Sequence, residues 1–232
     1  MAAERPAPSP TDRPGQAPAA RASEAIIRLQ GVTRRFGAFT AVDDVTLDVR
    51  PGEVFGLIGH NGAGKSTLLR ALAGIWPYGS GGVELPAGAK RLFLPQRPYL
   101  VLGSLRRVLS YPRTTAAPDE EISRILKLVG LEHFATRLDD VDDWSRILSL
   151  GEQQRLAFAR ILLIRPNWIF LDEATSALDE PRERALYNLL YQELPAVSTI
   201  SVGHRSTLFG LHNTELHLSD QTYTYQEIPH ES

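Results

Sequence analysis

The sequence contains no cysteine, which excludes a disulfide framework and a metal site made of thiolates. It also has no run near the roughly 18 apolar residues that a membrane-spanning helix needs, and its N-terminus lacks the apolar centre of a signal peptide. The formal net charge is only −2, so the overall charge gives no indication of nucleic-acid binding. With 43% hydrophobic and 22% charged residues among 232, the composition is that of one globular domain with at most a small appendage.

The two ends of the chain differ from its middle. Residues 1–24 are rich in proline and alanine and hold too little apolar surface to offset the entropy of ordering them. We therefore expect a disordered tail or linker over 1–24, one domain over 25–220, and a short C-terminal tail over 221–232.

Apolar patterns alternate with helical ones along the middle of the chain, which favours an α/β fold with a largely parallel central sheet. The glycines and proline within residues 77–82 predict a loop. The expected strands are 26–29, 41–49, 54–58, 90–94, 168–171 and 199–202, and the expected helices are 67–73, 118–129, 151–164 and 182–193.

The clearest motif is a glycine-rich loop between the expected strand 54–58 and the expected helix 67–73. Its spacing, G-x-x-x-x-G-K-S, lets backbone N–H groups surround phosphates, while Lys65 reaches the β- and γ-phosphates and Ser66 offers a hydroxyl to Mg²⁺. The alternative is a chance glycine turn, expected in about one chain in a hundred of this length. The ATP contacts predicted here are Gly59, His60, Asn61, Gly62, Ala63, Gly64, Lys65, Ser66 and Thr67.

Two carboxylates follow the apolar strand 168–171. Asp172 is predicted to hold Mg²⁺, and Glu173 to orient or polarise the attacking water. The alternative is an ordinary strand end with surface acids. With Lys65, Glu173 is a predicted catalytic residue.

The segment beginning at Leu148, Leu-Ser-Leu-Gly-Glu-Gln-Gln-Arg, resembles the Leu-Ser-Gly-Gly-Gln signature of ATP-binding-cassette (ABC) proteins. Leu150 stands where that motif usually has glycine. Ser149 and Glu152 also match a capping box that starts a helix, and both interpretations can hold together. The resemblance implies that Ser149, Gly151 and Glu152 contact ATP bound by a second cassette.

Other family motifs occur in the same order along residues 26–218. Gln96 resembles the glutamine that contacts Mg²⁺ and the transporter partner, and residues 176–179 resemble the loop that crosses the cassette dimer. His204 resembles the switch histidine at the γ-phosphate, and Phe36 the aromatic residue that stacks on adenine. Taken singly, a lone histidine after a strand is more often structural, and Phe36 is also compatible with a core residue at a strand edge.

The subfamily resemblance is divided. Residues 75–218 are most similar to subfamily D and to its bacterial relatives of the SbmA/BacA and YddA type. Residues 26–70 are more similar to free-standing ATPase subunits of ABC exporters. The short interval between Lys65 and Gln96 implies a reduced antiparallel β subdomain, beside a helical subdomain over about 97–150.

The resemblance implies a P-loop NTPase cassette that binds ATP and Mg²⁺ and powers an ABC membrane transporter. It further implies a head-to-tail homodimer driven together by ATP, a transmembrane permease as partner, no nucleic acid, and a cytoplasmic location at the inner face of a membrane. The alternatives are a soluble ABC ATPase without transport and a nucleotide-gated interaction module. Residues 99–102 are a candidate docking surface for the permease, with core packing as the alternative.

Overall fold

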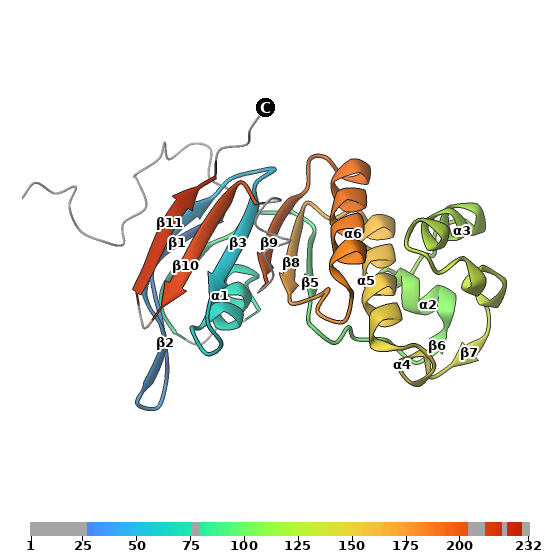
Figure 1. The fold of residues 1–232 in the computed structure, drawn as a ribbon, viewed down its shortest axis with the longest axis horizontal. Helices are drawn as coiled ribbons and strands as arrows, with labels where there is room; N and C mark the ends of the chain where they lie inside the picture. The colour runs from blue at the N-terminus through green and yellow to red at the C-terminus, as the bar shows by residue number, and fades with distance from the viewer. Residues whose placement is uncertain (1–26, 76–78, 204–211, 220–221, 229–232) are drawn as a thin grey trace, which may run out of the picture.

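The computed structural model describes residues 27–75, 79–203, 212–219 and 222–228. A six-stranded sheet in the order β11-β10-β3-β9-β8-β5 forms its centre, and every neighbouring pair is parallel except β10 and β11 (Figure 1). This arrangement confirms the α/β prediction. The strands are β3 (Val54–Gly59), β5 (Arg91–Leu94), β8 (Trp168–Asp172), β9 (Ser198–Val202), β10 (Thr214–Ser219) and β11 (Thr222–Glu227).

The central strands of the sheet are buried, which is typical of a parallel sheet. Every residue of β8 and β9 is buried, as expected for strands that have other elements packed on both faces. The helices α1 (Lys65–Leu72), α5 (Leu150–Ile164) and α6 (Glu180–Glu193) contribute side chains to the two hydrophobic cores, and α1 contacts β3, β8 and β9. The phosphate loop is thereby fixed between a buried strand and a buried helix.

A smaller antiparallel sheet consists of β2 (Phe39–Val49), β1 (Ile27–Phe36) and β4 (Ser80–Glu84), in that order. The prediction of a loop over 77–82 is wrong for β4. All five residues of β4 are exposed, so no burial pattern marks the strand, and it is defined by its pairing with β1, where Leu29 faces Val83.

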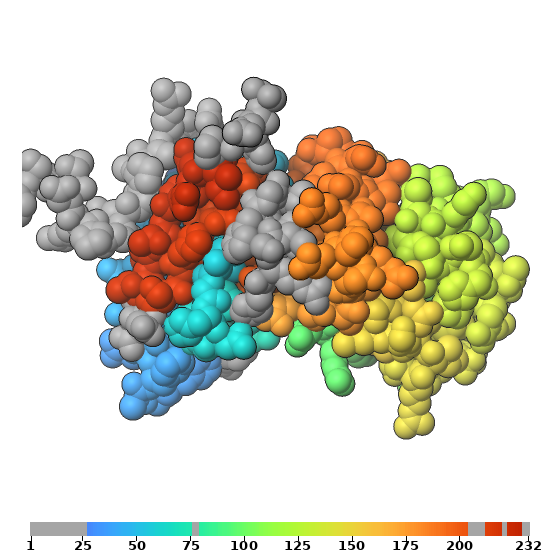
Figure 2. All heavy atoms as spheres, in the orientation of Figure 1, coloured from blue at the N-terminus to red at the C-terminus, as the bar shows by residue number. Residues whose placement is uncertain are grey.

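The short helices gather at the other end of the molecule. In Figure 2 the blue atoms of the β1–β2 hairpin and the yellow-green and yellow atoms of α3 and α4 lie at opposite ends, with α6 in orange between them. Trp144 is buried here, and its Nε1–H donates to the carbonyl of Gly103 at 3.1 Å. Within the described ranges, no helix is long and apolar enough to cross a membrane. The elements are β6 (Gly103–Ser104), α2 (Leu105–Ser110), α3 (Asp119–Leu128), the 3-10 helix Glu132–Arg137, β7 (Val141–Asp142) and α4 (Trp144–Ile147).

The chain ends bear on the predicted domain limits. Residues 1–24, predicted to form a tail, lie outside the described residues. Residues 222–227, also assigned to a tail, instead form β11. This strand pairs with β10, and the hydroxyl of its buried Tyr223 accepts a hydrogen bond from the N–H of Thr46 at 3.1 Å. Long-range contacts of this kind stabilise a polar strand that the sequence does not mark. The domain limits 25–220 and the helical subdomain over about 97–150 stay predictions.

Candidate functional site

The glycine-rich loop runs from the end of β3 to the start of α1, as the sequence predicts. Gly62 and Gly64 have φ values of 88° and 90°, a left-handed conformation that favours glycine. A Cβ on Gly64 would lie 1.9 Å from the carbonyl oxygen of Ala41, so this position has no room for a side chain. The loop and the N-terminus of α1 together form a cradle of backbone groups suited to an anion.

Lys65 lies at the centre of this cradle and is only 5% exposed. Its Nζ donates to the carbonyl oxygens of Gly59 at 2.7 Å and of His60 at 2.8 Å. Burial lowers the pKa of Lys65, and the carboxylates of Glu173 and Asp172 act in the opposite direction. The loop therefore holds the amino group of Lys65 where the phosphates of a nucleotide would lie.

The predicted Mg²⁺ ligands Ser66 and Asp172 are in direct contact, although 106 positions separate them in the sequence. The hydroxyl of Ser66 donates to Oδ1 of Asp172 at 2.6 Å. Arg70, one turn further along α1, donates to Oδ2 of Asp172 at 3.1 Å. Because hydroxyl and carboxylate oxygens are ligands that Mg²⁺ prefers, Ser66 and Asp172 fit the ion.

The predicted catalytic carboxylate Glu173 follows β8 directly and has a φ of 52°. The Nε2 group of Gln96 donates to Oε2 of Glu173 at 3.1 Å. The backbone N–H of Glu173 donates to the carbonyl of Val202 at 3.2 Å. The side chain of Glu173 also lines the pocket beside the phosphate loop. The structure thus brings Gln96 and Glu173 together from strands β5 and β8, which are neighbours in the sheet.

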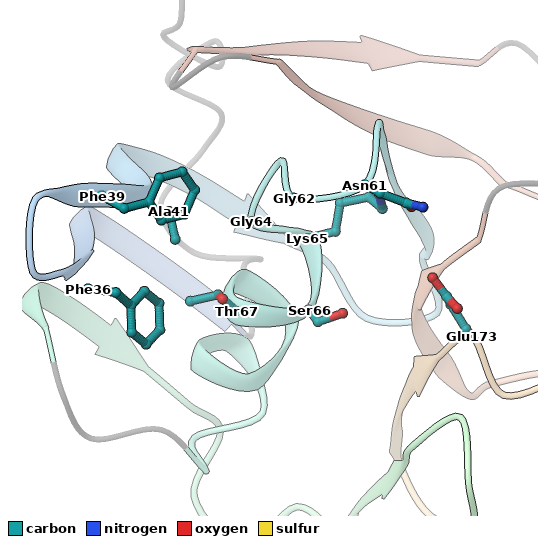
Figure 3. Close-up of a pocket in the computed structure, with 10 residues that line it drawn as sticks. All are labelled: Phe36, Phe39, Ala41, Asn61, Gly62, Gly64, Lys65, Ser66, Thr67 and Glu173. Carbon is teal, nitrogen blue, oxygen red and sulfur yellow. The ribbon is translucent and has the colours of Figure 1, made fainter.

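A pocket of about 420 Å³ lies over the loop (Figure 3). Phe36 and Phe39, at the tip of the β1–β2 hairpin, are 43% and 54% exposed, so Phe36 is not a core residue. Phe39 is not among the residues predicted from the sequence, where its only signal is its place beside the hairpin turn. The guanidinium of Arg34 lies 4.5 Å from the centre of the Phe36 ring. The lining residues are Phe36, Phe39, Ala41, Asn61, Gly62, Gly64, Lys65, Ser66, Thr67 and Glu173.

The signature residues Ser149, Gly151 and Glu152 do not line this pocket. They start α5, which begins beside α4 and away from α1 (Figure 1). The hydroxyl of Ser149 accepts from the N–H of Glu152 at 3.3 Å, and Oε2 of Glu152 accepts from the N–H of Ser149 at 2.9 Å. The hydroxyl of Ser149 also donates to Oε2 and, as the largest cause, lowers the pKa of Glu152. The predicted capping box is confirmed.

Two further predicted motifs are the dimer-crossing loop at residues 176–179 and the switch histidine His204. Asp179, the last residue of the predicted dimer-crossing loop, caps α6, where its Oδ1 accepts from the N–H of Arg182 at 2.9 Å. His204, the predicted switch histidine, lies outside the described residues. Arg70 and Gln154 are likewise not among the residues predicted from the sequence. Arg70 lies one turn after Ser66 and could have been found from helical spacing.

Comparisons with known proteins identify the family of the chain. A family model described as "ABC transporter" matches residues 42–176, more than half of the chain. An uncharacterised ABC transporter ATP-binding protein of Haemophilus influenzae is 46% identical over 183 residues, covering 78% of this chain and 31% of its own length.

Two relatives carry more specific names. The Escherichia coli inner membrane ABC transporter ATP-binding protein YddA is 38% identical over 170 residues, 73% of this chain and 30% of its own length. The chloroplastic ABC transporter D family member 2 of Arabidopsis thaliana is 38% identical over 229 residues, 78% of this chain and 32% of its own length. The chain spans about a third of the length of the relatives it matches. The predicted resemblance to subfamily D and the predicted fold class are confirmed, and the chain belongs to the ABC transporter family as an ATP-binding domain.

Proposed function

We propose that this chain hydrolyses ATP within a head-to-tail pair of cassettes and that the resulting cycle powers a membrane transporter. The observation that carries the proposal is the division of the predicted site residues. Lys65, Ser66 and Glu173 border one pocket, whereas the signature residues at the start of α5 lie elsewhere on the same chain. One chain then supplies the phosphate loop of one ATP site and the signature residues of another. In a pair of chains, each ATP site would combine the phosphate loop of one copy with the signature residues of the other.

The phosphate loop and Lys65 would bind the phosphates of ATP. Lys65 would exchange its bonds to two loop carbonyls for bonds to phosphate oxygens, while the N–H groups of the loop donate to the same phosphates. Ser66 and Asp172, with Gln96, would hold Mg²⁺, which when bound neutralises phosphate charge. Phe36 would stack on the adenine ring.

Glu173 would orient the attacking water and accept its proton. Glu173 lines the same pocket as Ser66, and its carboxylate accepts a hydrogen bond from Gln96, so it lies close to two of the predicted metal ligands. His204 would contact the γ-phosphate, which is the role that the resemblance to the switch histidine implies. Ser149 and Gly151 of the second copy would contact the phosphates from the opposite side, through the hydroxyl and the N-terminus of α5.

The membrane partner would be a transmembrane permease, and the chain would lie in the cytoplasm at the inner face of the membrane. The relatives named above are transporter components, which favours transport over a soluble ATPase. Tyr99 and Leu102 are 64% and 72% exposed, while Leu100 and Val101 between them pack against the core. Residues 99–102 would be the docking surface for the permease, through the exposed side chains of Tyr99 and Leu102.

The test is Glu173→Gln, which keeps the shape of the side chain and removes its ability to accept a proton. We expect retained ATP binding, loss of turnover by about a thousandfold, since general-base removal commonly costs a factor of 10² to 10⁴, and an ATP-bound dimer on gel filtration. The matched control is Glu120→Gln, at an exposed position of α3, which should behave as the wild type.

A second measurement tests the shared site. The ATPase rate per wild-type chain should rise with protein concentration, because two chains must meet to complete a site. A rate that stays flat down to dilute monomer would contradict the dimer, and a fully active Glu173→Gln variant would contradict the role of Glu173.

A further inference from the structure

One buried side chain connects three parts of the site that are separate in the sequence. Gln154 lies on α5, five residues after the helix cap Ser149, and its side chain is 0% exposed. Its Nε2 group donates to the carbonyl of Gln96 at 2.9 Å and to the hydroxyl of Ser176 at 3.2 Å. Its Oε1 accepts from the N–H of Ala177 at 3.0 Å. Both ends of this amide are therefore used.

The bonded segments are those next to the predicted catalytic carboxylate. Gln96 accepts from Gln154 through its backbone and donates to Glu173 through its side chain. Ser176 is held from the other direction, because its backbone N–H donates to the carbonyl of Glu173 at 3.1 Å. A displacement of Gln96 relative to residues 176–177 would thus stretch bonds to Gln154.

The same helix carries the signature residues. Gly151, one turn before Gln154, lies against the segment that Gln154 binds: a Cβ there would be 3.3 Å from Cδ2 of Leu178 and 3.6 Å from the carbonyl oxygen of Ala177. The start of α5 and residues 176–178 are consequently packed together and hydrogen-bonded as one unit.

The chemistry of this position requires an amide. A glutamine side chain offers two donors and an acceptor, and here two carbonyl or hydroxyl oxygens and one N–H are bound. A carboxylate would lose both donations, and an apolar side chain would lose all three bonds and leave polar groups without their partner.

We propose that Gln154 is a positioning residue for ATP hydrolysis, which holds the Gln96 segment and residues 176–177 in a fixed relation to the start of α5. This inference rests on the proposed function, in which the start of α5 completes the site of the second copy. Gln154 does not line the nucleotide pocket, so it acts on turnover and not on the binding of ATP to one chain.

The test compares two glutamines on different helices. Gln154→Met removes the three bonds with little change in shape or charge. Gln192→Met is the control, because Gln192 is an exposed residue of α6 and does not line the nucleotide pocket. The measurements are kcat at saturating ATP, the Kd of a non-hydrolysable ATP analogue for the dilute chain, and thermal unfolding.

We expect kcat to fall about tenfold in Gln154→Met, while the Kd stays within about twofold. The free energy lost with a buried hydrogen-bond partner, if it is lost from the transition state, corresponds to about a tenfold lower rate. Gln192→Met should keep the wild-type kcat. If Gln154→Met does not fold, Gln154→Asn takes its place, since its amide stays neutral but is one methylene too short to keep all three bonds.

Two results would overturn the inference. One is a wild-type kcat in Gln154→Met. The other is an equal loss of kcat in both variants together with an equal loss of folded protein. Either result is distinguishable from failure of the proposed function, which would show as a wild-type rate that does not depend on protein concentration or as an active Glu173→Gln variant.

Discussion

Replacing Gly64 by alanine should destabilise the protein much more than the same change at Gly62. The two glycines lie in one loop and have nearly the same φ, 90° and 88°. They differ in their surroundings. A Cβ on Gly64 would lie 1.9 Å from the carbonyl oxygen of Ala41 and 2.9 Å from its carbon, whereas a Cβ on Gly62 would meet nothing within 4 Å.

The magnitudes follow from these two facts. A left-handed backbone costs an alanine about 1–2 kcal/mol relative to glycine, and both variants share this cost. Only Gly64→Ala adds a collision with fixed backbone of β2, and such overpacking costs about 1–3 kcal/mol more. The expected difference between the two variants in free energy of unfolding is therefore about 1–3 kcal/mol.

Urea unfolding followed by tryptophan fluorescence measures this difference, because Trp144 and Trp168 are buried. Both variants should keep the wild-type slope of free energy against urea, and Gly64→Ala should have the lower midpoint. Equal midpoints would show that β2 moves away from the loop at little cost, and the reasoning from the Ala41 contact would be wrong.

Two further predictions concern the helix cap and the adenine contact. Ser149→Ala should lower the free energy of unfolding by about 1 kcal/mol in urea, and by more than Ser104→Ala, which loses a single bond from the N–H of Arg107. The bond from Ser149 lowers the pKa of Glu152, so it stabilises the folded state above about pH 4.5, the ordinary value of the group, and this contribution is lost on acidification. The free energy of unfolding of Ser149→Ala should therefore change less with pH below that value. The same change with pH in the wild type and the variant would contradict this reasoning. Phe36→Ala should weaken ADP binding by about two- to tenfold in calorimetry and leave the binding of inorganic tripolyphosphate unchanged, whereas an equal loss for both ligands would refute stacking on a base.

Much of the site could be predicted from the sequence because its chemistry is local. The glycines, Lys65 and Ser66 lie in one short segment, and a loop of this spacing between a strand and a helix has one main use. Asp172 and Glu173 follow an apolar strand directly, so their place at the carboxyl end of a buried strand was predictable. The Ser149–Glu152 capping box is likewise a pattern of four residues.

Other features depend on contacts between distant segments. Strand β4 has no buried residue, and β11 has polar residues at most positions, so pairing with β1 and β10 decides both. Gln154 gives no signal of its own in the sequence. Its importance emerges only when α5 packs beside Gln96 and Ser176.

The sequence by itself determined the alternation of strands and helices, the phosphate loop, its acidic partners and the helix cap, because each depends on residues that are neighbours along the chain. The tertiary structure alone decided that Ser66 touches Asp172, that Gln96 holds Glu173 and that the start of α5 lies outside the nucleotide pocket. The physical reason is that these contacts join segments up to 106 positions apart, and their meeting depends on strand order in the sheet, which no local pattern specifies.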